Sequence, residues 1–86
     1  MNFLELPSTR INDGVQHKVF FPNGYGASIV KHSFSYGGRK GLWELAVIKG
    51  TAESWDICYD TDITSDVLGY LSEEEVNSTL ENIAAL

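Results

Sequence analysis

The fold is decided by the stretch Leu42-Trp43-Glu44-Leu45-Ala46-Val47-Ile48, a nearly uninterrupted apolar run that lies between two glycines, Gly41 and Gly50. A short run of this composition, bounded by glycines, is typical of a central β-strand. Successive side chains of a strand point to opposite sides of the sheet, so Trp43, Leu45 and Val47 share one face. Because that face is wholly apolar, we expect it to lie beneath a helix.

Further strands are predicted on both sides of this run. His17–Phe21 is rich in β-formers and ends at a Pro-Asn-Gly turn, and Ala27–Phe34 follows it. After the central strand, Trp55–Tyr59 alternates apolar with polar residues, and we expect it to pair with the central strand through aromatic contacts between the Trp43 region and Trp55. A single helical turn is expected over residues 66–70.

The C-terminal segment 72–85 is predicted to be a helix. Ser72 and Glu75 have the spacing of a capping box. Val76, Leu80 and Ile83 recur on one apolar stripe. A helix of about twelve residues is not stable alone in water, so it must pack on the sheet.

These elements predict an α+β fold, a three- to four-stranded antiparallel sheet with a C-terminal helix packed on one face. At 86 residues the chain forms one domain. Within it, we expect residues 1–14 to be a lead-in segment with a short strand or a turn of helix, and residues 15–60 to form the antiparallel sheet. Any apolar sheet face that the single helix leaves uncovered would be the expected contact surface for a partner.

The charge is divided unevenly along the chain. Residues 1–50 hold six basic and three acidic residues, whereas residues 51–86 hold nine acidic residues and none that is basic. The acidic part therefore has a field of one sign, which repels nucleic acid and favours basic partners. No apolar run is long enough to span a membrane, and the first ten residues lack the pattern of a signal peptide. Cys58, the single cysteine, suits a reducing compartment, and we expect a soluble, cytoplasmic protein with Cys58 as a small buried side chain.

The segment Asp60-Thr61-Asp62-Ile63-Thr64 has the spacing of the nucleophile motif of haloacid-dehalogenase-like phosphotransferases. That chemistry requires a much longer domain and a downstream lysine, and no lysine follows Asp62. A calcium loop is also excluded, because Ser65 stands where a glycine is needed and Leu71 where a bidentate glutamate is needed. We interpret the segment as a turn, and we expect no catalytic residue, metal or cofactor in this chain.

Two groups of residues are candidates for binding a partner. The glycine-rich loop 35–41 presents Tyr36, Arg39 and Lys40, with Lys31, Tyr25 and Phe34 nearby, which suggests stacking and phosphate contacts. The overall charge of −6 argues against nucleic acid, so a protein partner is expected. The second group is acidic and consists of Asp60, Asp62, Glu74 and Glu81.

A resemblance to known proteins extends over about residues 20–86. It rests on four sequence segments: Pro22–Val30, Gly41–Val47, Ile57–Thr61 and Val67–Leu71. The chain resembles a family of small uncharacterised proteins encoded by tailed bacteriophages and prophages. The resemblance implies a phage origin and the host bacterial cytoplasm, and it supplies no activity for any residue. We therefore expect a non-enzymatic phage accessory protein that binds a host or phage protein, such as an inhibitor of a host protein or an anti-CRISPR-type inhibitor of a defence system. The alternative is a virion or assembly-associated structural protein that forms homo-oligomers.

Overall fold

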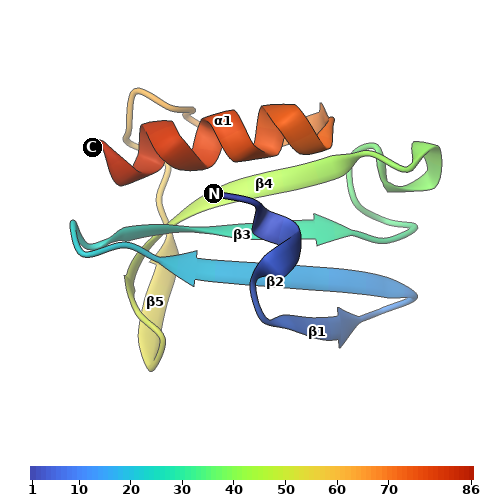
Figure 1. Cartoon of the computed structure of the whole chain (residues 1–86), viewed down its shortest axis with the longest axis horizontal. Coiled ribbons are helices and arrows are strands. Elements are labelled where there is room, and N and C mark those ends of the chain that lie inside the picture. Colours follow the sequence, from blue (N-terminus) through green and yellow to red (C-terminus); the bar gives the residue numbers. More distant parts are fainter.

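The computed structural model describes residues 1–86 and consists of a curled antiparallel sheet with one α-helix packed on it (Figure 1). Strands β1 to β5 are neighbours in chain order. β6 pairs with β4 beside the first half of that strand, and β5 pairs with its second half. The elements are η1 (Phe3–Glu5), β1 (Ser8–Ile11), β2 (Gly14–Phe20), β3 (Tyr25–Lys31), η2 (Gly38–Lys40), β4 (Trp43–Thr51), β5 (Ser54–Ile57), β6 (Leu68–Leu71) and α1 (Glu73–Ala84).

The α+β class, the antiparallel sheet and the C-terminal helix are confirmed, but the predicted number of three to four strands is wrong. β1 is a short strand within the lead-in segment 1–14, and β6 replaces the helical turn expected over residues 66–70. Each of these two strands has only four residues. β6 is also irregular, since Tyr70 has a left-handed backbone with φ of 57° and the pairing with β4 contains a register shift.

β4 is the central strand, as predicted, and its alternation places the core. Trp43, Leu45 and Val47 are buried in one cluster with the apolar stripe of α1, so the predicted helix-covered face is confirmed. The expected aromatic pairing is wrong. Trp55 lies opposite Gly50, whereas Trp43 lies opposite Leu71, because β4 runs on to Thr51 before the hairpin turns.

Helix α1 begins where the sequence predicts. The Ser72 hydroxyl accepts a hydrogen bond from the Glu75 N–H at 3.2 Å, and the Glu75 carboxylate accepts one from the Ser72 N–H at 2.9 Å. This reciprocal capping box satisfies two backbone donors that the helix would otherwise leave unpaired. The Ser72 backbone N–H, and then its hydroxyl, lower the pKa of Glu75. No helix of the structure has the length and apolar character needed to cross a membrane.

The N-terminal segment contributes to the core. Phe3 is fully buried and makes edge-on contacts with Trp43, at 4.7 Å between ring centroids, and with His17, at 5.5 Å. The Phe3 N–H also donates to the Asn77 Oδ1 of α1 at 2.9 Å. The first turn of the chain is therefore packed against both the sheet and α1.

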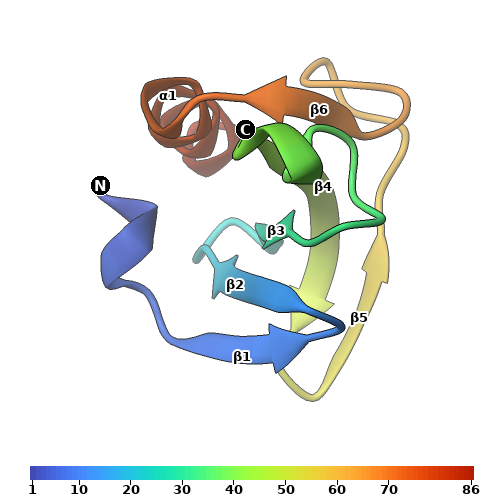
Figure 2. The same cartoon turned by 90° about the vertical axis from the view of Figure 1, so that its right-hand side faces the viewer.

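The sheet face opposite α1 is covered by the curl of the sheet itself. The β4–β5 hairpin bends back beneath the first strands (Figure 2), and the Lys18 ammonium of β2 lies 5.1 Å from the centroid of the Trp55 ring of β5. β2 and β5 are not neighbours in the sheet, so this contact closes the curl. Ile48, which points away from the helix, is consequently fully buried. The centre of this face is thus not the open apolar surface on which a partner could have been expected.

Candidate functional site

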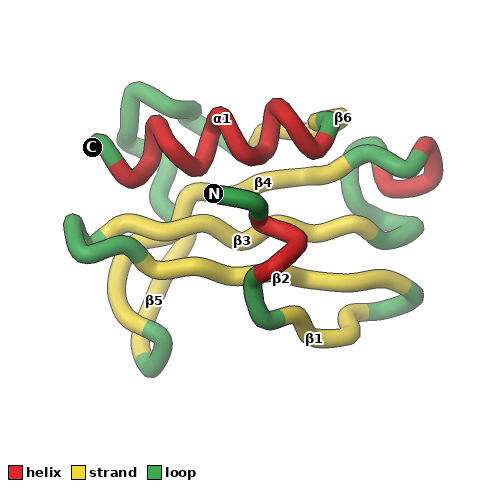
Figure 3. Tube along the Cα trace, viewed as in Figure 1, coloured by secondary structure: helices red, strands yellow, loops and turns green.

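The connections β1–β2 and β3–β4 meet at one end of the long axis of the molecule (Figure 1; loops and η2 in Figure 3). In the longer connection, η2 lies between Gly37 and Gly41, both with a left-handed backbone. The Gly37 carbonyl accepts from the N–H groups of Lys40 and Leu42, which closes the turn. We call these two connections, together with the adjoining ends of β1, β3 and β6, the loop end. Its basic residues are Arg10, Lys31, Arg39 and Lys40, and its exposed aromatic residues are Phe34, Tyr36 and Tyr70.

Strand register brings distant basic residues to the loop end. Val15 of β2 lies opposite Arg10 of β1 on one side and opposite Lys31 of β3 on the other, so the three side chains form a row on one sheet face. Arg39 of η2 joins Arg10 and Lys31 around a cavity of about 490 Å³. The cavity is lined by Arg10, Asp13, Gly14, Val15, Lys31, His32, Ser33, Gly38 and Arg39. Three cationic side chains thus face one carboxylate.

Exposed aromatic side chains lie beside this basic cavity. Phe34, Tyr36 and Tyr70 are 79%, 60% and 55% exposed. The Tyr70 N–H donates to the Tyr36 carbonyl at 3.1 Å, which ties β6 to the β3–β4 connection. A second cavity, of about 240 Å³, is lined by Ser33, Ser35, Gly37, Arg39, Lys40 and Tyr70. Because Ser33 and Arg39 line both cavities, the basic and aromatic parts form one surface.

Hydrogen bonds to the backbone hold the loop end in place. Asp13 Oδ1 accepts from the Ser33 N–H at 2.9 Å, and Glu44 Oε1 accepts from the Tyr36 N–H at 2.8 Å. The Ser33 backbone donor, followed by its side chain, lowers the pKa of Asp13, so this carboxylate stays ionised while it braces the loop. Arg39 Nε donates to the Ser33 carbonyl at 3.1 Å and is oriented by it.

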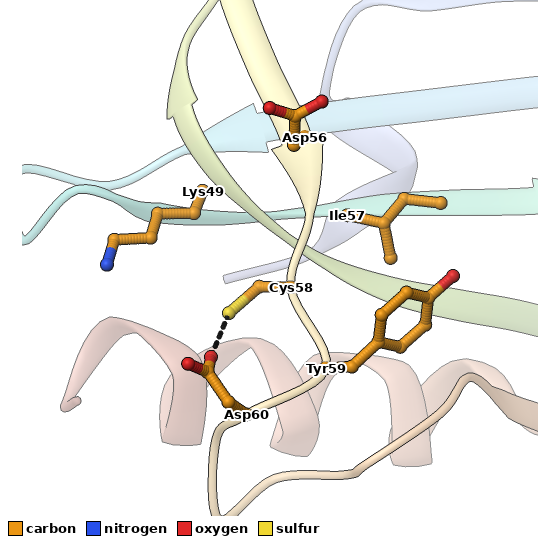
Figure 4. Close-up of a pocket in the computed structure, with 6 residues that line it drawn as sticks. All are labelled: Lys49, Asp56, Ile57, Cys58, Tyr59 and Asp60. Carbon is orange, nitrogen blue, oxygen red and sulfur yellow. Dashed lines mark hydrogen bonds between the residues drawn. The ribbon is translucent and has the colours of Figure 1, made fainter.

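A third cavity, of about 400 Å³, lies at the other end of β4 and is lined by Lys49, Asp56, Ile57, Cys58, Tyr59 and Asp60 (Figure 4). The Cys58 thiol is buried, as predicted, and donates to Asp60 Oδ1 at 2.8 Å. This hydrogen bond is the main reason that the pKa of Asp60 is lowered. It also gives Asp60 a local structural role.

The segment that contains Asp60 and Asp62 has no regular secondary structure, and no hydrogen bond joins either aspartate side chain to a backbone N–H, as a turn built on these aspartates would have required. Its hydrogen bonds to the backbone come from threonines: Thr61 Oγ1 accepts from the Ile63 N–H at 3.2 Å and Thr64 Oγ1 from the Asp66 N–H at 3.1 Å. The structure contains no group of three His, Cys, Asp or Glu side chains arranged to hold a metal ion.

The seven residues predicted to bind a partner divide between separate places. Tyr36, Arg39 and Lys40 lie together at the loop end, whereas Asp60 and Asp62 belong to the segment that follows β5. Glu74 and Glu81 are exposed on α1, seven residues apart. Tyr25, which the sequence placed near the basic loop, instead lies beside Lys49, with its ring centroid 5.4 Å from the ammonium. Sequence reasoning missed Arg10 and Tyr70, because only strand pairing brings them to the site.

In class, the molecule is an α+β protein whose curled antiparallel sheet carries one C-terminal helix and a loop end that is both basic and aromatic. No family model, no curated protein and no solved structure matches the chain.

Proposed function

We propose that this chain is a non-enzymatic protein-binding module that contacts its partner through the loop end. The proposal rests on one observation: three exposed aromatic side chains and four of the six basic residues of this acidic protein lie together at the loop end. The resemblance to small phage proteins suggests an accessory factor that acts in the bacterial cytoplasm, for instance by occupying a host protein.

Interface energetics support this choice of surface. Aromatic residues and arginine are enriched at protein interfaces and dominate their binding energy, whereas lysine and acidic residues are depleted. Phe34 is the most exposed large apolar side chain of the molecule. Burying an aromatic ring of this size on a partner contributes about 1.5–3 kcal/mol through the area removed from water. Leaving such a ring in water has no structural benefit.

The rigidity of the surface also supports the proposal. The connection that carries Phe34, Tyr36 and Arg39 is held at Ser33 by Asp13 and at Tyr36 by Glu44. A braced loop loses less conformational entropy on binding than a free one, so more of its contact energy appears as affinity. These two carboxylates thus contribute to binding by holding the loop.

The test is affinity capture from a bacterial lysate with two matched double variants. Phe34→Ala with Lys40→Ala removes one exposed aromatic and one exposed lysine from the loop end. Tyr59→Ala with Lys49→Ala removes the same kinds of side chain from the cavity at the other end of β4. We expect the wild-type chain to retain a stoichiometric protein, the first variant to lose at least about tenfold of it, and the second to retain it.

Equal capture by both variants would overturn the choice of surface, and loss confined to Tyr59→Ala with Lys49→Ala would move the site to the other cavity. Recovery of nothing but further copies of the chain would overturn the proposal in favour of a homo-oligomeric structural protein. Circular dichroism and thermal melts of each variant establish that the changes in capture do not come from unfolding.

A further inference from the structure

We infer that the loop end binds carboxylates, and that the part of the partner it recognises is an acidic peptide segment with at least two acidic side chains. This inference rests on the protein-binding function proposed above and names the chemistry of its partner. It comes from the two adjoining cavities and the donors that line them.

The larger cavity holds donors that are suited to an oxyanion. Arg10 and Arg39 carry planar guanidinium groups, which match a carboxylate with two parallel hydrogen bonds. Lys31 also lines the cavity and adds a third positive charge there, and its ammonium lies 4.5 Å from the centroid of the Trp43 ring. Asp13 does not neutralise these three charges, and its Oδ1 already accepts from Ser33.

His32 adds a neutral donor to the same wall. Its Nδ1 lies 3.1 Å from the Phe34 N–H and 3.5 Å from the Asn12 side-chain amide, so Nδ1 acts as an acceptor. The ring proton therefore sits on Nε2, which is left free to donate. A carboxylate in this cavity could thus meet donors of three kinds: guanidinium, ammonium and imidazole.

The smaller cavity provides a second place for an anion. It adjoins the first through Arg39 and Ser33, and Lys40 supplies its second cation. The Lys40 ammonium lies 5.7 Å from the centroid of the Tyr70 ring, at the edge of the aromatic group. A peptide could therefore place one acidic side chain in each cavity and an apolar side chain against the exposed aromatics.

Charge distribution favours an acidic peptide over a single-stranded nucleic acid. A nucleic acid carries one charge for every nucleotide along its whole length. α1 begins at the same end of the molecule (Figure 1), and its first turn contains Glu73, Glu74 and Glu75. A polyanion that continues past the cavities would meet these carboxylates and the field of a chain with net charge −6. A peptide can confine its negative charges to the two cavities.

The test uses the full chain and defined probes: hexaglutamate, hexaglutamine, a six-residue oligothymidylate and inorganic phosphate. We expect hexaglutamate to bind most tightly, to lose affinity as salt is raised, and to shift the backbone amide resonances of residues 31–40 and not those of residues 56–60. Replacing Arg10→Gln together with Arg39→Gln should weaken hexaglutamate binding roughly tenfold. The matched control, Lys18→Gln with Lys49→Gln, removes the same charge from elsewhere and should change binding less than about twofold.

Several results would overturn the inference. These are tighter binding of the oligothymidylate, equal binding of hexaglutamine, binding of phosphate alone, or equal weakening by both double variants. The variants also separate this inference from the proposed function. If Arg10→Gln with Arg39→Gln leaves lysate capture intact while Phe34→Ala with Lys40→Ala abolishes it, the loop end is the interface but does not bind carboxylates. If Arg39→Gln destabilises the fold, the exposed Arg10→Gln alone gives the same comparison.

Discussion

At the scale of single residues, several acids of this protein act on its own backbone. Glu75 accepts from the Ser72 N–H, Asp13 from the Ser33 N–H and Glu44 from the Tyr36 N–H. The capping acid was predictable, because its partner is three residues away in the sequence. The acids that brace the loop end were not, because their partners lie 8 and 20 residues away and depend on the pairing of strands.

These hydrogen bonds predict a loss of stability in acid. The folded state lowers the pKa values of Asp13 and Glu75 from ordinary values of 3.8 and 4.5. Their contribution to stability is therefore complete above these ordinary values and is lost as the pH falls through the lowered folded values. The free energy of unfolding, measured with urea at pH 7 and at about pH 3, should decrease less for Glu75→Gln than for the wild-type chain. The glutamine keeps an acceptor that does not titrate in this range. Glu53→Gln, a change in the exposed β4–β5 turn, is the control and should show the full decrease. An identical decrease in both variants would contradict this role of Glu75.

At the scale of elements, the connection 35–37 and strand β6 are fitted closely together. A Cβ atom added to Gly37 would lie 2.9 Å from the Tyr70 Cα, and one added to Gly69 would lie 2.5 Å from the Tyr36 Cβ. Gly37 also has a φ of 94°, which side-chain-bearing residues rarely adopt. The aromatic part of the loop end therefore depends on glycines at the two contact points.

Gly37→Ala should consequently destabilise the protein by about 2 kcal/mol or more, since it combines a left-handed backbone with a steric overlap. Gly41→Ala is the matched control. It has the same type of backbone, with φ of 77°, and open space around the added methyl group, so only the loss of about 1 kcal/mol for a left-handed residue with a Cβ is expected. Chemical denaturation measures the loss of unfolding free energy in each variant. Equal losses would show that the close packing of Gly37 against Tyr70 does not contribute to stability.

The elements also show which features of the fold the sequence could predict. β4 followed from an apolar run bounded by glycines and α1 from its periodic apolar stripe, and the capping box predicted the start of the helix. β1 and β6 lack such runs, because an exposed edge strand needs no apolar alternation and β6 is interrupted at Tyr70. The candidate site followed only where its residues are adjacent in sequence, as Arg39 and Lys40 are. Arg10 joins them through register, which a single chain does not reveal.

At the scale of the whole molecule, the two ends of the chain pack on each other across the sheet. Phe3 is buried between Trp43 and His17, and its N–H is bound by Asn77 of α1. The Asn23 side chain donates to the Ile83 carbonyl at 2.9 Å, so the β2–β3 turn also holds the last turn of the helix. The helix is thus anchored along its length by segments that are distant in sequence.

Phe3→Ala should therefore lower the free energy of unfolding by about 3–5 kcal/mol, as expected for a large side chain removed from the core. For an 86-residue domain this is a large share of the total stability, and thermal unfolding should occur at a much lower temperature. Leu4→Ala changes the neighbouring side chain, which is 42% exposed, and should alter stability by no more than about 0.5 kcal/mol. Similar melting temperatures for the two variants would contradict a core role for Phe3.

The contact between Phe3 and Asn77 joins residues 74 positions apart. The core around Phe3 therefore cannot be completed until a segment that is made much later is available. A ribosome makes Phe3 before it makes α1, so a nascent chain exposes the apolar face of its sheet until the helix has emerged. Contacts between such distant residues raise the contact order, which slows folding and lengthens the period in which aggregation competes. The core should therefore be completed only when α1 docks, after every strand of the sheet has been made.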